Sequence, residues 1–169
     1  MINLARVAKA ATPAISALIA AGIAHEVLTY QHDPRSTSFG AEAVEHLALS
    51  HGVVAEQVFK TLVLALPKGL AVAVIPVPRT LSLKAAAAAL GVPKAAMAQP
   101  ADAQRATGYV VGGISPLGQR RARPTVIDAS ACDWDRILCS GGKRGLDIAL
   151  APRDLVDLTD AVLAPITAD

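Results

Sequence analysis

The sequence predicts a single α+β domain built around a twisted, largely antiparallel or mixed β-sheet. Predicted strands outnumber predicted helices and follow one another in mixed order, which favours α+β over a regularly alternating α/β fold. A chain of 169 residues suits one sizeable core and is short for two domains. Two apolar runs, 58–66 and 70–76, are joined by Pro67-Lys68-Gly69 and predict a hairpin near the centre of the sheet.

The N-terminal part predicts a short helix followed by a strand. Thr12-Pro13 supplies an N-cap and a first-turn proline, apolar residues follow at helical spacing, and Gly22 ends the pattern. Residues 23–30 alternate between apolar and polar side chains, which is typical of a half-buried strand. A helix and a strand of this kind are the first elements of the predicted domain.

A loop and a second helix come next. Residues 31–38 are dense in turn formers and predict a loop that ends in Phe39. This phenylalanine could fill an edge of the core or cover a ligand, since loops often carry function. Residues 41–50 resume the helical period, and His46 is expected on the polar surface of that helix.

The C-terminal half adds two helices and then a series of short strands. Ser82 opens a helix that Gly91 stops, and a second helix is expected over 100–106. The further predicted elements are strands at 124–128, 136–139 and 146–150, a helix from 151, and an edge strand within 162–166. Between them lie two glycine-rich segments, which we expect to form loops.

Those glycine-rich segments are candidate binding loops. They span residues 112–118 and 140–145. Glycines let the backbone approach a ligand closely and aim N–H groups at an oxyanion or a phosphate. Neither GxGxxG nor GxxxxGK[ST] occurs in the chain, so a nucleotide-binding fold is not predicted.

Lys60 is the unusual residue of the central hairpin, because it places a cation in an otherwise apolar strand. Burying an ammonium costs several kcal/mol unless it is paired or loses its proton. A chain tolerates this cost where the lysine takes part in chemistry. The alternative is that Lys60 lies at the start of the strand and extends its amine to water.

Composition and charge exclude several classes of function. Sixteen Lys and Arg against fourteen Asp and Glu give a net charge of +2, so any nucleic-acid contact must come from a local patch. The densest patch is 119–123, which is either an exposed loop or a contact to a phosphate backbone. With no apolar run of about 18 residues and no secretory signal, we expect a cytoplasmic protein that does not enter a membrane.

No metal or cofactor is predicted. Cys132 and Cys139 lack the spacing of a zinc site, and we expect two free thiols. The four histidines give no Ser-His-Asp arrangement. The polar residues that remain are Lys60 and the lone strand carboxylate Asp147, together with the hydroxyls of Thr61, Ser115 and Ser140. Such a set suits binding of a small charged group and stabilisation of an ester oxyanion.

Five segments of the chain together resemble the YbaK/EbsC family. They are Thr29-Tyr30-Gln31-His32-Asp33-Pro34, Phe39-Gly40, Val58-Phe59-Lys60-Thr61-Leu62, the stretch from Thr107 to Gly118, and the stretch from Ser140 to Asp147. The resemblance runs from about residue 12 to about residue 163 and is strongest to the bacterial Cys-tRNA(Pro) deacylases, which are related to the editing domain of prolyl-tRNA synthetase. It implies the partly barrel-like fold of that domain, with an N-terminal extension at 1–11 and the editing domain at 12–169.

The resemblance also implies an activity and a site. The activity is trans-editing, the cleavage of the ester in mischarged Cys-tRNA(Pro), and also in Cys-tRNA(Cys), with the substrate's own thiol attacking its carbonyl. Lys60 would contact a substrate phosphate, and Gly112 would present its backbone to the carbonyl. Residues that would bind the substrate are Tyr30, Phe39, Thr61, Gly113, Ser115, Ser140 and Asp147. The implied partners are the acceptor end of mischarged tRNA and prolyl-tRNA synthetase, and not DNA.

Two alternatives to this function are open. A protein of the same fold could act on Ala-tRNA(Pro), or it could bind aminoacyl-tRNA or a synthetase without turnover. Between Phe39 and Lys60 the chain is about four residues longer than the family pattern, around residues 48–53, and we expect a helix extension there.

Overall fold

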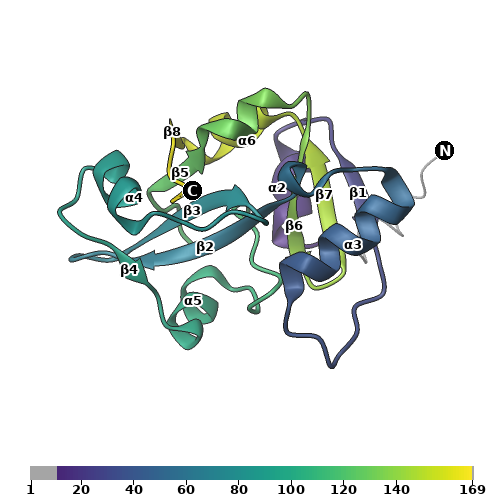
Figure 1. The fold of residues 1–169 in the computed structure, drawn as a ribbon, viewed down its shortest axis with the longest axis horizontal. Coiled ribbons are helices and arrows are strands. Elements are labelled where there is room, and N and C mark those ends of the chain that lie inside the picture. Colours follow the sequence, from purple (N-terminus) through teal and green to yellow (C-terminus); the bar gives the residue numbers. More distant parts are fainter. Residues whose placement is uncertain (1–10, 169) are drawn as a thin grey trace.

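A computed structural model describes residues 11–168, which form one α+β domain. Figure 1 shows its two parts, one built on β2, β3 and α4 and the other on β6, β7 and α3. The N-terminal extension predicted at 1–11 falls outside the described residues except for residue 11. No helix among the described residues is long and apolar enough to cross a membrane. The helices and strands are α2 (Pro13–Ala20), β1 (Glu26–Thr29), α3 (Phe39–His51), β2 (Phe59–Ala65), β3 (Leu70–Pro76), α4 (Leu83–Leu90), β4 (Ala96–Met97), α5 (Pro100–Thr107), β5 (Thr125–Asp128), β6 (Ile137–Lys143), β7 (Leu146–Leu150), α6 (Pro152–Thr159) and β8 (Val162–Ala164), with 3₁₀ turns η1 (Ala55–Gln57) and η2 (Ala129–Asp133).

The strands form two sheets, and this arrangement confirms the predicted mixed α+β class. A three-stranded antiparallel sheet has the order β1-β7-β6, and a five-stranded mixed sheet has the order β4-β2-β3-β5-β8. A parallel bridge between Val58 and Leu138 links them where β2 begins, without closing a barrel. The start of β2 therefore lies at the junction of the two sheets.

The predicted central hairpin is confirmed. β2 and β3 pair antiparallel from Phe59 opposite Pro76 to Ala65 opposite Leu70. The five-stranded sheet also contains parallel pairs, because β5 returns beside β3 and β8 beside β5. Lys60 is the second residue of β2 and lies opposite Ile75, so it is close to the junction of the sheets.

The caps of two helices are those that the sequence predicts. The Thr12 hydroxyl accepts a hydrogen bond from the Ile15 N–H at the start of α2, and the Ser82 hydroxyl accepts one from the Ala85 N–H at the start of α4. Gly91 ends α4 in the left-handed conformation. These local signals fix the ends of the helices independently of the packing.

Two predicted elements differ from the structure. Phe39, expected in a loop, is the first residue of α3, and Ser38 before it makes no side-chain cap. The expected glycine loop at 140–145 is mostly strand, since β6 continues to Lys143 through an irregularity between Ser140 and Lys143. Glycines are common at such bulges as well as in loops, so their clustering predicted a loop where the structure has an irregular strand.

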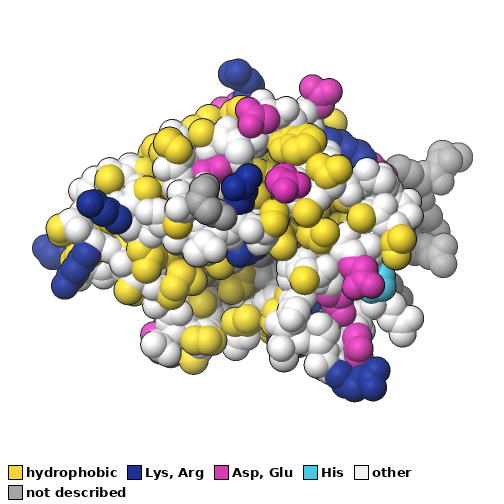
Figure 2. Space-filling model, viewed as in Figure 1, with side chains coloured by type: hydrophobic (Ala, Val, Ile, Leu, Met, Phe, Trp, Pro, Cys, Tyr) yellow, Lys and Arg dark blue, Asp and Glu magenta, His cyan; other side chains and the backbone are white. Residues whose placement is uncertain are grey.

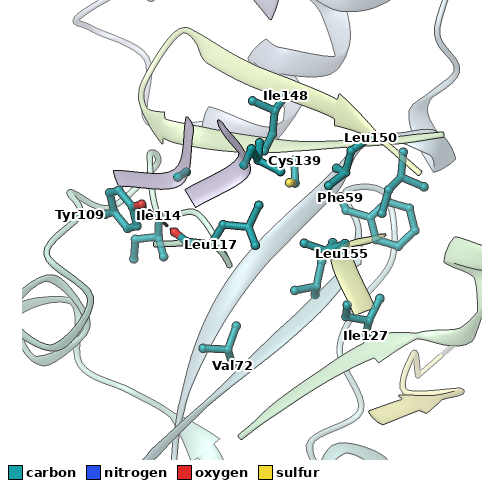
Figure 3. Close-up of a cluster of buried hydrophobic side chains, with 14 of the residues drawn as sticks. Phe59, Val72, Tyr109, Ile114, Leu117, Ile127, Cys139, Ile148, Leu150 and Leu155 are labelled. Atoms are coloured by element: carbon teal, nitrogen blue, oxygen red, sulfur yellow. Dashed lines mark hydrogen bonds between the residues drawn. The ribbon is translucent and has the colours of Figure 1, made fainter. Parts of the chain in front are cut away.

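The main core lies between the two sheets (Figure 3). Phe59 and Val72 of the hairpin meet Ile148 and Leu150 of β7 there, and all four side chains are buried. Two smaller clusters lie beneath α3 and beneath α4. The two sheets are thus held in a fixed relation on either side of the start of β2.

Candidate functional site

A cavity of about 230 Å³ opens where the start of β2 faces the start of α3 and the β6–β7 pair. Segments far apart in the sequence supply its walls. Its lining consists of Tyr30, Phe39, Gly40, Ala43, Val58, Phe59, Lys60, Thr61, Leu62, Val77, Val111, Gly112, Ile114, Ser140 and Asp147.

Seven of the site residues predicted from the sequence line this one cavity: Tyr30, Phe39, Lys60, Thr61, Gly112, Ser140 and Asp147. The other two, Gly113 and Ser115, do not line it. Gly113 packs against the backbone of Lys143, where an added Cβ would lie 2.7 Å from Cα. Ser115 is fully buried, and its hydroxyl accepts a hydrogen bond from the Leu117 N–H.

Lys60 and Thr61, the second and third residues of β2, bring polar groups to the cavity. Lys60 is half-buried, so neither complete burial nor full extension into water describes it. The Thr61 hydroxyl is buried and, within residues 11–168, has no hydrogen-bond partner. A buried hydroxyl without a partner loses about 1–3 kcal/mol of hydrogen bonding. A polar ligand in the cavity would recover it.

Gly112 is required at its position by both conformation and contact. Its φ is +86°, and an added Cβ would lie 2.5 Å from Cγ of Phe39. No partner for its N–H is found in the part of the chain that the structure describes. The loop therefore holds its backbone directly against the aromatic wall and keeps a donor available for a ligand.

Arg144 joins this wall to the glycine loop. Its guanidinium carbon lies 4.6 Å from the centroid of the Phe39 ring, within the range of a cation–π interaction. Its Nε donates to the Val111 carbonyl at 2.9 Å. One exposed side chain thus contacts both Phe39 and the residue before Gly112.

Tyr30 and Phe39 are each supported from behind by a histidine. The rings of Tyr30 and His46 stack with centroids 4.9 Å apart, and those of His32 and Phe39 lie 5.8 Å apart. His46 was expected on the surface of its helix, but it is half-buried against Tyr30. The prediction was wrong because the periodicity of α3 does not show that Tyr30, the residue after β1, packs against the polar side of this helix.

Glu42 ties the loop before α3 to the helix itself. It accepts from His32 Nδ1 at 2.6 Å and from the Asp33 N–H at 3.0 Å. Burial raises the pKa of Glu42, but these hydrogen bonds outweigh burial, so the pKa is lower than usual. The ionised carboxylate therefore holds the loop that leads into Phe39.

Asp147 is the buried acid of the cavity. It lies on β7 opposite Ser140 and is 6% exposed. Burial raises the pKa of Asp147 to about 7. Burial, followed by the nearby Asp147, raises the pKa of Tyr30 to about 12. Burial also raises the pKa of the Cys139 thiol, again with a contribution from Asp147, so Cys139 remains a thiol.

The raised pKa of Asp147 predicts a pH-dependent stability. Between about pH 4 and pH 7 the folded state keeps a proton that the unfolded state releases, so stability falls as pH rises, by on the order of 4 kcal/mol in total. Asp147→Asn should be little changed relative to wild type at pH 4 and more stable at pH 8. Urea unfolding of both proteins across this range measures the difference, and parallel curves would contradict the assignment.

Several cavity residues were not anticipated from the sequence. Ala43, Val77 and Ile114 are small or aliphatic residues that read only as core positions. Arg144 and Glu42 act from behind the lining. The basic residue within a glycine-rich segment was a signal for Arg144, but no local pattern pairs Glu42 with a loop ten residues earlier.

The cavity combines an apolar wall with a few polar groups, which is the composition of a small-ligand site. It has one cation, one carboxyl group with a pKa near neutrality, three hydroxyls and a backbone donor. Its lining contains neither histidine nor cysteine. Among the described residues, no group of three or more His, Cys, Asp or Glu could hold a metal ion. The arrangement suits a small polar acyl group and stabilisation of charge on its carbonyl oxygen.

Comparison with known proteins gives consistent matches. Residues 40–158 match the family model of the aminoacyl-tRNA editing domain. A protein of Enterococcus faecalis, provisionally named the Cys-tRNA(Pro)/Cys-tRNA(Cys) deacylase EbsC, is 40% identical over 126 residues, which is 74% of this chain and 77% of that protein.

Two crystal structures share the fold. The protein APE2540 has a TM-score of 0.80 and 26% identity, covering 92% of this chain and 99% of that one. A protein provisionally described as a trans-editing enzyme for prolyl-tRNA synthetase has a TM-score of 0.77 and 25% identity, covering 93% of this chain and 96% of that one. The matched family model covers most of the chain and includes Lys60, Gly112 and Asp147. The chain therefore belongs to the aminoacyl-tRNA editing domain family.

Proposed function

We propose that the protein is a trans-editing deacylase that cleaves the aminoacyl ester of mischarged Cys-tRNA(Pro), and also of Cys-tRNA(Cys). The observation that carries the proposal is the convergence of Lys60, Thr61, Gly112 and Asp147 on one small cavity. Membership of the editing family supports an aminoacyl-tRNA deacylase, and the name of the E. faecalis relative supports cysteine as the amino acid.

Each polar group has a role in this proposal. The Gly112 N–H donates to the ester carbonyl oxygen as negative charge develops on it, and one such donor is worth about 3 kcal/mol. Lys60 binds the terminal phosphate or backbone of the tRNA and fixes the ester in place. The Thr61 hydroxyl, which lacks a partner among the described residues, takes a polar group of the amino acid or ribose.

Cleavage is assisted by the thiol of the substrate. Its sulfur bonds to the carbonyl carbon, the ester bond to the ribose oxygen breaks, and the thiol proton ends on the ribose hydroxyl. The products are a cyclic thiolactone and free tRNA. This route needs no protein nucleophile, in agreement with a lining that has neither histidine nor cysteine. Asp147 and Ser140 hold the amino group or ribose, and Tyr30 and Phe39 enclose the side chain.

Deacylation of a panel of substrates tests the proposal. Purified protein should release cysteine from Cys-tRNA(Pro) much faster than alanine or serine from tRNA(Pro), because alanine and serine have no thiol to attack the carbonyl. The fit of the pocket alone would discriminate weakly, since one methylene is worth only about 1–3 kcal/mol. Esters of S-methylcysteine should bind but resist release. Unimpaired release of S-methylcysteine would identify water as the nucleophile.

The same panel separates the alternatives. Fastest release of alanine would make the protein an Ala-tRNA(Pro) deacylase. Binding without release of any amino acid would indicate a non-catalytic module that recognises aminoacyl-tRNA or a synthetase.

In our proposal the editing domain spans residues 12–169, acts in the cytoplasm and receives its tRNA with the help of prolyl-tRNA synthetase. The description of the structural relative supports that partner.

A further inference from the structure

The charges of this chain are divided between two parts of the molecule. Residues 57–127 contain nine Lys and Arg and a single acidic residue, Asp102. The rest of the chain contains seven Lys and Arg against thirteen Asp and Glu. The net charge of +2 therefore conceals a basic part and an acidic part. Residues 57–127 form β2, β3, α4, β4 and α5, which is the part of the molecule on the left of Figure 1.

The strand register gathers several of these cations at one end of the five-stranded sheet. Lys68 lies in the turn between β2 and β3. Lys94 comes two residues before Ala96, which pairs with Ala65 at the end of β2, so Lys94 lies beside that turn. Figure 2 shows Lys and Arg side chains at this end, whereas Asp and Glu side chains lie mainly around α6 and α3.

Arginines from two further segments reach the same end. The Pro124 carbonyl accepts a hydrogen bond from the Val72 N–H, which places the adjacent Arg123 beside the start of β3. Arg105 lines a shallow hollow together with Leu70, the first residue of β3. We call Lys68, Lys94, Arg105 and Arg123 the basic end.

Most of this charge is available to a partner. Lys68 and Lys94 are exposed and, within residues 11–168, form no ion pair. Arg105 pairs with Asp102, the single carboxylate of this part of the chain, and both are largely exposed to solvent. Charge concentrated in this way attracts a polyanion even where the whole-molecule charge is small.

We propose that the basic end binds the phosphate backbone of the tRNA acceptor stem while the 3′ end reaches the cavity. This inference rests on the proposed function for the identity of the RNA. β2 connects the two sites, with Lys60 at its start and the turn at its end. Six residues of strand span about 20 Å, which corresponds to about six phosphates of a stacked strand. The acidic part of the molecule disfavours the opposite orientation.

Charge reversal tests the proposal on an uncharged acceptor-stem minihelix that ends in single-stranded CCA. Lys68→Glu and Lys94→Glu should each weaken binding about fivefold or more and lower the salt dependence by about one counterion. Arg153→Glu on α6 is the matched control, because it makes the same change of charge on an exposed residue outside the basic end. It should change the affinity less than twofold. Fluorescence anisotropy between 50 and 200 mM salt measures all four proteins.

Three results would overturn the proposal. One is wild-type affinity in both lysine variants, and another is an equal loss in Arg153→Glu. The third is that the two lysine variants lose binding to prolyl-tRNA synthetase but keep their binding to RNA, which would assign the basic end to a protein partner. Because the minihelix carries no ester, this assay stays informative even if no deacylation is found.

A kinetic comparison links the basic end to the cavity. In the two lysine variants, the loss of kcat/KM on cysteinyl-minihelix should exceed the loss on 3′-O-cysteinyl-adenosine by about fivefold or more, since the nucleoside has no stem to bind. Equal losses on both substrates would mean that the substitutions disturb the cavity and would contradict the proposal. Thermal melts of each variant monitor the fold.

Discussion

Lys60→Ala should lower the single-turnover rate of Cys-tRNA(Pro) deacylation by about 10²-fold, because it removes the amine that fixes the ester in place and a misplacement of about 1 Å can cost that much in rate. Lys60 is half-buried at the start of β2 and lines the cavity together with Gly112 and Asp147. Its neighbours Phe59 and Val63 form the core on the other face of the strand, so the fold does not depend on the amine.

Two comparisons make this result specific. Lys60→Arg keeps the charge but replaces a compact ammonium by a larger planar guanidinium, so its rate should lie between those of Lys60→Ala and wild type. Lys84→Ala removes an exposed cation from α4 and should leave the rate unchanged. Equal rates for wild type and Lys60→Ala, with both proteins folded, would reject the catalytic assignment.

Gly112→Ala should inactivate the protein by displacing Phe39. The new Cβ would lie 2.5–2.7 Å from three atoms of the Phe39 ring, which cannot yield without moving away from His32 and Arg144. A displacement of about 1 Å at a reacting centre can cost about 10²-fold in rate. The same measurement of deacylation detects the loss, and the substitution also adds backbone strain.

Gly69→Ala separates the contact from the strain. Gly69 has a φ of +84°, close to that of Gly112, but an added Cβ there would meet no atom within 4 Å. Each substitution should therefore cost about 1–2 kcal/mol of stability through the left-handed backbone. Only Gly112→Ala should lose activity in excess of that shared effect. Similar activity in the two variants would show that Phe39 does not need its present position.

Local sequence signals predicted the elements whose ends are fixed by their own residues. The Thr12 and Ser82 caps and the apolar β2–β3 hairpin are of this kind, because the interactions that define them are short-range. The path of β6 through its glycines was not predicted, since pairing with β7 overrides the tendency of glycine to form turns. The parallel pairing of β5 with β3 depends on residues 53 positions apart and has no local signal.

The candidate site shows the same division. Lys60 and Asp147 were detected because a charge in an apolar strand is anomalous wherever the strand lies, and both line the cavity. Ser115 was predicted to bind substrate because it has a hydroxyl, but that hydroxyl accepts a hydrogen bond within its own loop. The supporting contacts of Arg144 and His46 join segments whose neighbourhood only the tertiary fold creates.

The most direct measurement is a crystal structure of the protein with an amide-linked, non-cleavable analogue of 3′-cysteinyl-adenosine. The cysteinyl group should lie in the cavity between Phe39 and Asp147, with its carbonyl oxygen about 3 Å from the Gly112 nitrogen. Lys60 should face the 5′ side of the nucleoside, where the tRNA phosphate would continue. An analogue bound elsewhere, or one with its carbonyl turned away from Gly112, would contradict the account.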